Sequence, residues 1–328
     1  MIIESAFKPA WWLKNPHMQT LYPKFVDLQK LVLTYTKERI ELTDGDFIDL
    51  AWSNHLIPHH SPLVILLHGL GGGLHSHYVK SLFSSLNAKG IRCVMMYFRG
   101  ASDEPNRFIR AYHAGGTQDF SYLLEILKKR EPHTKKAVIG VSLGGNALLK
   151  WLGETSEQSF IQCAVAISVP FQLSKTAHKL QHGFSKVYQL HLLKRLKQML
   201  KLKMQKNHLE HVITSTQLKQ IKNLWEFDNQ ITAPIHGFKN ADDYYNSASC
   251  KAYLTGIKTP TLIIHAEDDP FMTPDVIPKF DELSCDVTLE LSPHGGHVGF
   301  VSANEKGAPF LWLKDRIPYF LKQNGLFE

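Results

Sequence analysis

The stretch KKAVIGVSLGGNALLKWL, residues 135–152, contains an apolar run, a serine flanked by glycines and a helical pattern in succession. We expect a buried strand over 135–142 and a helix from Leu143 to Leu152, with Ser142 at the turn between them. Glycines two residues before and after this serine would let the strand and the helix pack closely around a strained turn with an exposed hydroxyl. The G-x-S-x-G pattern is common by itself, and its position between a strand and a helix makes it informative.

Short apolar runs alternate with longer amphipathic segments along most of the chain. We expect further buried strands at 63–69, 91–98, 163–170, 259–266 and 285–292, and helices at 76–89, 117–129 and 306–321, the last broken at Pro318. Continuous apolar runs are typical of parallel strands that are covered on both faces. Residues 31–53 suggest an antiparallel hairpin at the sheet edge, turning at Asp44-Gly45. The predicted fold class is α/β, with a mostly parallel sheet and helices on both faces.

Residues 171–256 interrupt this alternation with segments that resemble helices and loops. We expect them to form a helical cap inserted into one sheet domain. Residues 1–170 and 257–328 would then form the catalytic core, with residues 1–30 packed on it. The length of 328 residues and the ordinary composition, 44% hydrophobic and 20% charged, exclude a disordered, collagen-like or coiled-coil chain.

The positive charge of the chain is concentrated in this cap. The net charge is +7, yet eleven Lys and Arg and a single acid, Glu210, lie between residues 175 and 222. Helical spacing predicts an apolar face that turns toward the sheet domain or a pocket, and a basic face in solvent. The apolar face includes Leu192, Leu196 and Met199. The basic face includes Lys194, Arg195, Lys197 and Lys201. The expected role of this basic face is that of a solvated surface; the alternatives are weak contact with an anionic membrane surface and attraction of an acidic substrate. Nucleic acid is not an expected partner, because no recognised nucleic-acid fold or interleaved aromatics are present.

A nucleophilic serine needs a base, and the base needs an orienting carboxylate. Candidates follow two predicted strands, in the segments HAEDDP (265–270) and HGGH (294–297). Asp268 and Asp269 compete for the role of the acid, and the usual spacing after a small residue favours Asp269. His294 and His297 compete for the role of the base, and the preceding Gly-Gly, which gives the loop freedom to reach over the sheet, favours His297.

The glycine-rich segment HGLGGG, residues 68–73, follows the first predicted parallel strand. It lacks both G-x-G-x-x-G and the Lys-Ser/Thr of a phosphate-binding loop, so we expect no nucleotide cofactor. We expect an oxyanion hole instead, formed by the backbone N–H groups of Leu70 and Leu143. Each such donor is typically worth about 3–4 kcal/mol of transition-state stabilisation.

No metal site and no other cofactor are predicted. The histidines that invite a metal interpretation lie in loops without H-E-x-x-H spacing; they are His55, His59, His60, His75 and His77. The four cysteines are far apart and form no C-x-x-C pair.

Several segments resemble those of a known family. GVSLGG (140–145), HAEDDPF (265–271) and HGGHVGF (294–300) look like α/β-hydrolase motifs. The chain also resembles the YheT-like bacterial proteins, which are predicted esterases related to the mammalian α/β-hydrolase-domain proteins 1, 2 and 3. The segments that carry this resemblance are NPHMQT (15–20), HGLGG (68–72), FRGASDEPNR (98–107), YHAGGTQD (112–119), GFSKVY (183–188) and EFDNQITAPIHGF (226–238). The resemblance extends from about Trp11 to Phe320.

This resemblance implies a catalytic triad of Ser142, Asp269 and His297. It also implies hydrolysis of acyl esters, often with medium-chain or glycerolipid acyl groups. The expected function is therefore that of a serine carboxylic-ester hydrolase acting on a small-molecule acyl ester. The alternatives are an alcohol O-acyltransferase that uses the same triad and a non-catalytic homologue that binds lipids or partners. The chain shows no signal-peptide pattern and no apolar run near 18 residues, so we expect a cytoplasmic protein.

Overall fold

A nine-stranded sheet organises the part of the chain that the computed structural model describes, residues 1–25, 33–53, 56–155, 160–207 and 213–328. Its strands are, in spatial order, β1 (Ile2–Glu4), β9 (Val287–Ser292), β8 (Thr261–Ala266), β7 (Ile161–Ile167), β6 (Lys136–Val141), β4 (Leu63–Leu67), β5 (Arg92–Met96), β3 (Phe47–Ser53) and β2 (Tyr35–Glu41). In this spatial order, each strand from β1 through β9, β8, β7, β6 and β4 to β5 is parallel to the next. Strand β3 is antiparallel to both of its neighbours, β5 and β2. The predicted fold class is confirmed.

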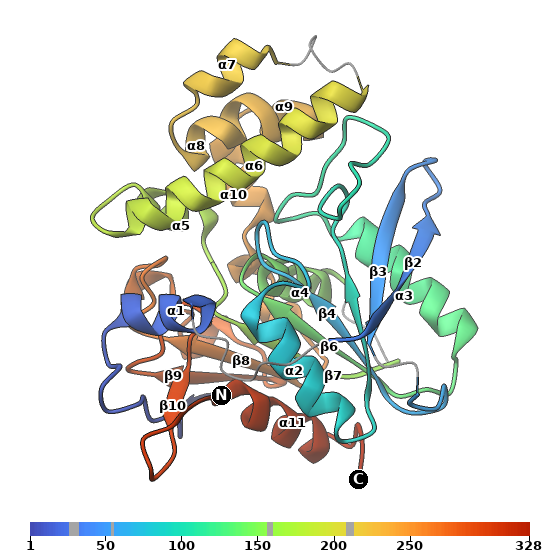
Figure 1. Cartoon of the computed structure of the whole chain (residues 1–328), viewed down its shortest axis with the longest axis vertical. Helices are drawn as coiled ribbons and strands as arrows, with labels where there is room; N and C mark the ends of the chain where they lie inside the picture. Colours follow the sequence, from blue (N-terminus) through green and yellow to red (C-terminus); the bar gives the residue numbers. More distant parts are fainter. Residues whose placement is uncertain (26–32, 54–55, 156–159, 208–212) are drawn as a thin grey trace.

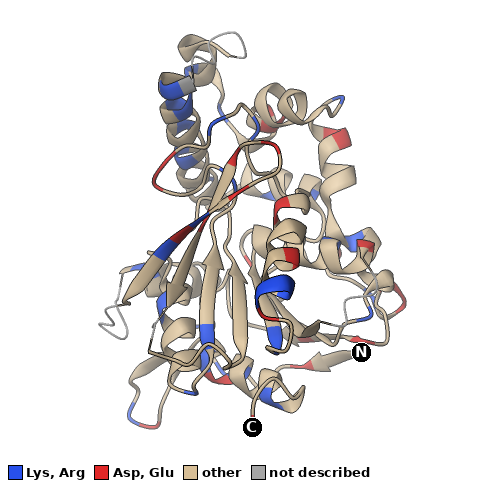
Figure 2. Ribbon diagram, turned by 90° about the vertical axis from the view of Figure 1, so that its right-hand side faces the viewer, with Lys and Arg blue, Asp and Glu red and all other residues tan. Residues whose placement is uncertain are grey.

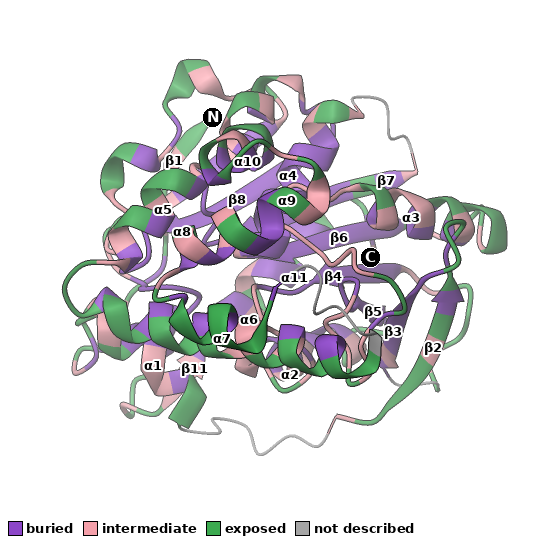
Figure 3. Ribbon diagram, turned by 90° about the horizontal axis from the view of Figure 1, so that it is seen from above, coloured by how far each residue is buried: buried purple, intermediate pink, exposed green. Residues whose placement is uncertain are grey.

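Helices cover both faces of this sheet (Figure 1). One face carries α2 (His77–Asn87) and α11 (Leu313–Gln323), and the other carries α3 (Gln118–Arg130) and α4 (Leu143–Glu154). Alternate residues of β4 pack toward opposite faces, so all five residues of this strand are buried. Figure 3 shows the same burial along the central strands. Double-sided burial explains why the strands are continuous apolar runs rather than alternating ones.

The edges of the sheet differ in how far the sequence predicts them. β2 and β3 form the expected antiparallel hairpin, with Gly45 at φ 82° in the turn; residues 31–32 of the predicted segment lie outside the described residues. At the opposite edge β1 pairs with β9, and the N-terminal ammonium group donates to the carbonyl of Val287 at 2.6 Å. The sequence pattern does not predict β1, because three residues are too few to show a period.

The prediction for the C-terminal segment was wrong at two points. Residues 309–311 do not begin a helix but form β11 (Pro309–Leu311), which pairs with β10 (Val301–Ala303). The following helix, α11, continues through Pro318 instead of breaking there. Proline cannot donate to the carbonyl four residues earlier, that of Lys314. The hydroxyl of Ser85 in α2 donates to this carbonyl at 2.6 Å, so the lost helical bond is replaced.

The residues between β7 and β8 form a helical layer over one end of the sheet (Figure 1). Its helices are α5 (Leu173–Leu180), α6 (Ser185–Asn207), α7 (Ser215–Gln220), α8 (Leu224–Phe227), α9 (Ala233–His236) and α10 (Ala241–Ala248), with a π-helical turn at Asp228–Thr232 and a 3-10 helix at Cys250–Gly256. We call this layer the cap. No helix among the described residues is long and apolar enough to cross a membrane.

Basic residues follow one another along α6 (Figure 2), but only some of them face solvent. Lys194 and Lys201 are exposed, as expected. The expectation was wrong for Arg195 and Lys197. Arg195 donates to the carbonyl of Gly71 at 2.6 Å, and Lys197 donates to the backbone carbonyl of Ile221 at 2.5 Å. Helix α6 contacts both the sheet domain and other parts of the cap, so these two long side chains reach backbone carbonyl groups instead of water.

Candidate active site

Ser142 occupies a sharp turn between β6 and α4. Its backbone has φ 53° and ψ −118°, a region that residues with a side chain rarely adopt. The turn is held by a hydrogen bond from the N–H of Ser142 to the carbonyl of Ile167 in the next strand, at 2.8 Å. A Cβ atom at Gly144 would lie 2.3 Å from the carbonyl oxygen of Leu67, so this position of the motif admits only glycine. The sequence therefore builds a strained turn that presents the hydroxyl at the end of the sheet.

His297 lies between this hydroxyl and a carboxylate. Its Nε2 atom is 3.0 Å from Oγ of Ser142, and its Nδ1 atom is 2.8 Å from Oδ2 of Asp269. The three residues follow β6, β9 and β8, whose parallel carboxyl ends meet at one edge of the sheet. The ring of Phe271 stacks on the imidazole, with centroids 3.8 Å apart and an interplanar angle of 6°. This geometry allows the imidazole to move a proton at the serine hydroxyl while the carboxylate holds its tautomer.

The competing residues form a separate pair beside this array. The Oδ2 atom of Asp268 lies 3.3 Å from Nδ1 of His294, and its Oδ1 atom accepts the N–H of Gly296 at 2.9 Å. The structure therefore brings Asp269 and His297 to the serine, and it turns Asp268 and His294 toward each other. Consecutive side chains leave the backbone in different directions, which separates the two aspartates although they are neighbours in sequence.

The histidine loop is supported by α1 (Pro16–Phe25), a contribution that the sequence motifs did not predict. The hydroxyl of Thr20 accepts the N–H of His297 at 2.9 Å, and the amide oxygen of Gln19 accepts the N–H of Val301 at 2.7 Å. A Cβ atom at Gly296, which has φ 59°, would lie 2.5 Å from the carbonyl oxygen of Pro16. The signal available in the sequence was two adjacent polar residues in NPHMQT, but only their complete burial shows that they hold the loop.

The glycine-rich loop after β4 lies directly against Ser142. Four of its backbone N–H groups have acceptors: those of Gly69, Gly71, Gly72 and Gly73. Among the described residues, no acceptor forms a hydrogen bond with the N–H of Leu70 or with that of Leu143. These are the two donors expected from the sequence, and both remain available for an oxygen atom bound beside the serine.

His68 and Arg195 hold this loop from opposite sides. The N–H of Phe98 donates to Nε2 of His68 at 3.3 Å, so Nδ1 carries the proton and donates to the carbonyl of Gly69 at 2.7 Å. Burial lowers the pKa of His68 to about 4, which keeps the ring neutral. From the cap, Arg195 donates to the carbonyl of Gly71. The position of Leu70 thus depends on both the core and the cap.

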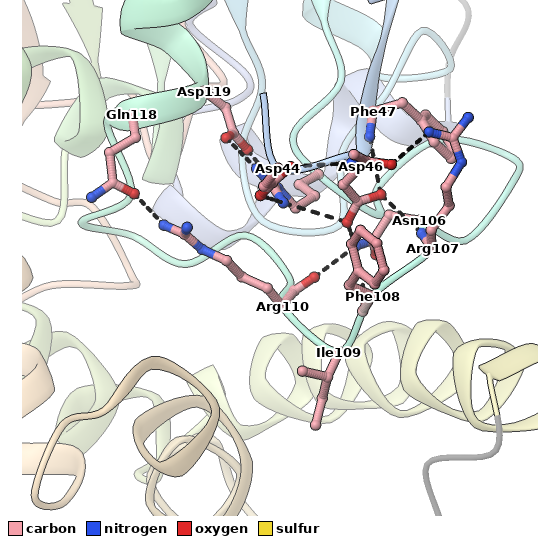
Figure 4. A network of polar contacts seen from close by, with 12 residues as sticks. Asp44, Asp46, Phe47, Asn106, Arg107, Phe108, Ile109, Arg110, Gln118 and Asp119 are labelled. Atoms are coloured by element: carbon pink, nitrogen blue, oxygen red, sulfur yellow. Dashed lines mark hydrogen bonds and ion pairs between the residues drawn. The ribbon is translucent and has the colours of Figure 1, made fainter. Parts of the chain in front are cut away.

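The loop between β5 and α3 is fastened by a buried polar network, which Figure 4 shows. Arg99 is buried and pairs with Asp119 and Asp44, both at 2.6 Å. Asp46 is completely buried and accepts from the side-chain amide of Asn106 at 2.5 Å. The sequence does not predict a role for these residues, because a dense run of polar residues has no period that distinguishes a buried network from a solvated loop.

This network positions two parts of the site. The loop carries Tyr112, whose hydroxyl accepts the N–H of Gly71 at 3.1 Å. It also carries Ile109, which points toward α6 in Figure 4. The buried ammonium group of Lys203 in α6 donates to the carbonyls of Ile109 and Arg110, both at 2.7 Å. The cap is therefore tied to the core close to the glycine-rich loop.

A cavity of about 900 Å³ lies between the cap and the sheet domain and reaches Ser142 and His297. Apolar side chains of the cap form much of its wall; they include Leu173, Leu180, Leu192, Leu196, Met199 and Ile231. The predicted apolar face of α6 thus turns toward this cavity. A pocket of this volume with a few convergent polar groups is suited to a small molecule that is mostly apolar.

The histidines considered as metal ligands have other surroundings. Nε2 of His75 accepts from Arg195 at 3.0 Å, and Nε2 of His77 lies 3.2 Å from the carbonyl oxygen of Val298. His59 and His60 are exposed, whereas His55 lies outside the described residues. Within the described ranges, no group of three or more His, Cys, Asp or Glu side chains could hold a metal ion.

Comparison with known proteins identifies the family of this chain. A sequence profile described as the alpha/beta hydrolase fold matches residues 62–303. This chain belongs to the α/β-hydrolase family. The match includes all three residues that meet at the strand ends, as well as the glycine-rich loop.

This α/β-hydrolase is similar to proteins from bacteria, fungi and animals. It is 42% identical to the Escherichia coli K12 protein named "Putative esterase YheT", over 96% of this chain and 92% of that protein. It is 33% identical to the monoacylglycerol lipase of Saccharomyces cerevisiae over 78% of this chain, although the match spans only 56% of that protein. Human phospholipase ABHD3 is 26% identical over 92% of this chain and 75% of its own length. The resemblance stated from the motifs is confirmed.

Solved structures confirm the fold of this α/β-hydrolase. The Pyrococcus furiosus esterase Pf2001 superimposes with a TM-score of 0.56 at 21% identity, covering 90% of this chain and 92% of that one. Identity at this level supports the architecture alone.

Proposed function

We propose that this α/β-hydrolase cleaves acyl esters through a triad of Ser142, His297 and Asp269. The observation that carries the proposal is the single imidazole that bridges the serine hydroxyl and a buried carboxylate, at 3.0 and 2.8 Å. A serine hydroxyl becomes a nucleophile when a neighbouring base accepts its proton. The relatives named as an esterase, a lipase and a phospholipase support the same class of reaction.

The proposed reaction has two halves. Oγ of Ser142 attacks the ester carbonyl while Nε2 of His297 takes its proton, and the resulting oxyanion accepts from the N–H groups of Leu70 and Leu143. The intermediate collapses when His297 returns the proton to the leaving alcohol, which leaves the acyl group on the serine. Water then attacks this acyl-enzyme with His297 again as the base, and the carboxylic acid is released. Asp269 holds the imidazole tautomer and stabilises the imidazolium throughout.

Acyl transfer to an alcohol would use the same residues, since only the second nucleophile differs. The cavity wall is largely apolar, and an alcohol could enter it as readily as water. Measuring the ratio of ester to free acid among the products, with increasing concentrations of added alcohol, distinguishes transfer from hydrolysis.

We expect this α/β-hydrolase to prefer medium-chain esters to acetate. Each methylene buried in an apolar cavity contributes about 0.8 kcal/mol, so p-nitrophenyl octanoate should exceed the acetate by at least about tenfold in kcat/KM. Met199→Trp, which fills part of the cavity, should shift the best chain length downward. Leu202→Trp is the matched control, because Leu202 is exposed on the same helix. Acetate as the best substrate of the wild-type protein would contradict an acyl cavity.

We also propose that the exposed lysines of α6 give weak contact with anionic lipid surfaces. Each Lys near such a surface contributes about 1 kcal/mol, so Lys194→Glu with Lys201→Glu should weaken binding to phosphatidylglycerol vesicles by at least about tenfold at low salt. The matched control is Lys306→Glu with Lys322→Glu, two exposed lysines outside the cap. Sedimentation with vesicles measures the effect, and absence of wild-type binding at low salt would rule the contact out.

A further inference from the structure

The wall of the active-site cavity is strongly unbalanced in charge. Among the described residues that line it, four are Lys or Arg and a single one is a carboxylate, Asp228. This carboxylate is already satisfied, because it accepts from the hydroxyls of Thr232 and Tyr245, both at 2.7 Å. Burial also raises its pKa to about 6, which favours the neutral form more than at an ordinary aspartate. Among the described residues, Asp228 forms no ion pair with any Lys or Arg of the cavity wall.

Three cationic or titratable side chains gather at the rim of this cavity. Lys24 lies in the last turn of α1, and His191 and Arg195 lie one turn apart on α6. We call these three residues the rim cluster. Figures 1 and 3 place α1 and α6 on the same side of the molecule. Lys24 and His191 are exposed, so a ligand can reach them from solvent.

The members of the rim cluster repel one another. Desolvation and the charge of Arg195 lower the pKa of Lys24. Desolvation and the charges of Lys24, Arg195 and Lys194 lower the pKa of His191. Desolvation and Arg195 also lower the pKa of His75, although Asp103 acts in the opposite direction. Asp103 is mostly exposed and pairs with Lys37. An anion placed in the cluster would relieve this repulsion.

The cluster also has free hydrogen-bond donors. Lys24 has no hydrogen-bond or ion-pair partner in the described part of the chain. Arg195 uses Nη1 for the carbonyl of Gly71 and for His75, and its Nε and Nη2 atoms donate to no described residue. A guanidinium with free donors beside an ammonium is the arrangement that binds phosphate and carboxylate groups.

We propose that Lys24, His191 and Arg195 form a subsite for an anionic group, phosphate or carboxylate, carried by the ester substrate. The proposal rests on the proposed esterase function and names its substrate class: an acyl ester whose other end is negatively charged. The acyl chain would lie against the apolar cap wall and the anion at the rim. Binding of a charge remote from the ester should lower KM more than it raises kcat.

The test compares octanoyl esters of one glycerol skeleton below their micelle concentrations: octanoylglycerol, its 3-phosphate, its 3-phosphocholine and octanoylglycerate. We expect at least one of the two net-anionic esters, the phosphate or the glycerate, to exceed octanoylglycerol by about tenfold or more in kcat/KM at low salt. The better of the two identifies the anion as phosphate or carboxylate. If neither anionic ester exceeds octanoylglycerol, the subsite is wrong. If the phosphate ester is the better of the two, a phosphocholine ester equal to it would overturn recognition of net negative charge.

Variants locate the subsite. Lys24→Gln with His191→Gln should reduce the preference for the anionic ester to within about threefold, mainly through KM. Lys186→Gln with His182→Gln is the matched control, because these residues are exposed at the start of α6 and just before it but do not line the cavity. Arg195 is left unchanged, since it also holds the glycine-rich loop. An unchanged preference in the first variant would overturn the assignment.

Calorimetry separates this proposal from the proposed function. Glycerol 3-phosphate or glycerate should bind the wild-type protein and bind the Lys24/His191 variant at least about tenfold more weakly, whether or not any ester is hydrolysed. If octanoylglycerol is cleaved but neither anion binds, the subsite is wrong and the esterase function stands. If an anion binds as expected but no ester is cleaved, the esterase function is wrong and the anion site stands.

Discussion

Replacing Ser142 by alanine is expected to reduce ester hydrolysis by about four to six orders of magnitude in kcat. The loss is this large because the hydroxyl is the group that forms the acyl-enzyme, and Nε2 of His297, 3.0 Å away, forms no other hydrogen bond with a described residue. The variant should also lose labelling by a fluorophosphonate probe. Both results are measured on purified protein with p-nitrophenyl octanoate and with a gel-based probe assay.

A matched control keeps this test specific. Ser168 is also a serine with a positive φ, 49°, at the end of the neighbouring strand, and its hydroxyl accepts the N–H of Val298 at 3.0 Å. Ser168→Ala should retain probe labelling, although it removes a hydrogen bond to the histidine loop. Circular dichroism should show that Ser142→Ala is folded. Undiminished hydrolysis by folded, pure Ser142→Ala protein would disprove the proposed nucleophile.

The second large effect concerns the two pairs of competing residues. His297→Ala and Asp269→Asn should each reduce kcat by at least about a hundredfold, because the first removes the base and the second removes the charge that stabilises the imidazolium. Steady-state kinetics with the same octanoate ester measure both.

The neighbouring residues provide the controls. Asp268→Asn and His294→Ala should each stay within about tenfold of the wild-type protein, because these side chains bind each other and the N–H of Gly296 rather than Ser142. If Asp268→Asn is more damaging than Asp269→Asn, or His294→Ala more damaging than His297→Ala, the assignment of that pair is wrong. The reaction class would still stand.

Much of the fold could be predicted from local patterns. The central strands are continuous apolar runs because both faces of the sheet are covered, and a run of this kind is visible without any tertiary information. Errors arose where a tertiary contact replaces a local requirement. Pro318 stays within α11 because Ser85 donates to the carbonyl that proline leaves free, and β1 exists because β9 offers it an edge. Neither contact has a local signature.

The residues of the candidate active site likewise fall into those that the sequence predicts and those that only the structure places. Sequence alone predicted the sharp turn at Ser142, the candidate acid and histidine segments that follow it in the chain, and the glycine-rich loop. Each of these is a short motif of residue types at fixed spacing. Only the tertiary structure shows which aspartate faces which histidine, because that depends on side-chain directions at the ends of two different strands.

Longer-range packing decided the remaining features. Thr20 supports the histidine loop from a helix 277 residues away in sequence. Arg195 does not face solvent as expected, because the carbonyl of Gly71 in the glycine-rich loop lies within its reach. Periodicity assigns a residue to a face of its own helix, but it does not reveal what lies opposite that face. The side chains at the cavity rim likewise become a candidate anion subsite only because α1 and α6, far apart in the chain, meet in the fold, where His17 of α1 contacts Tyr188 of α6.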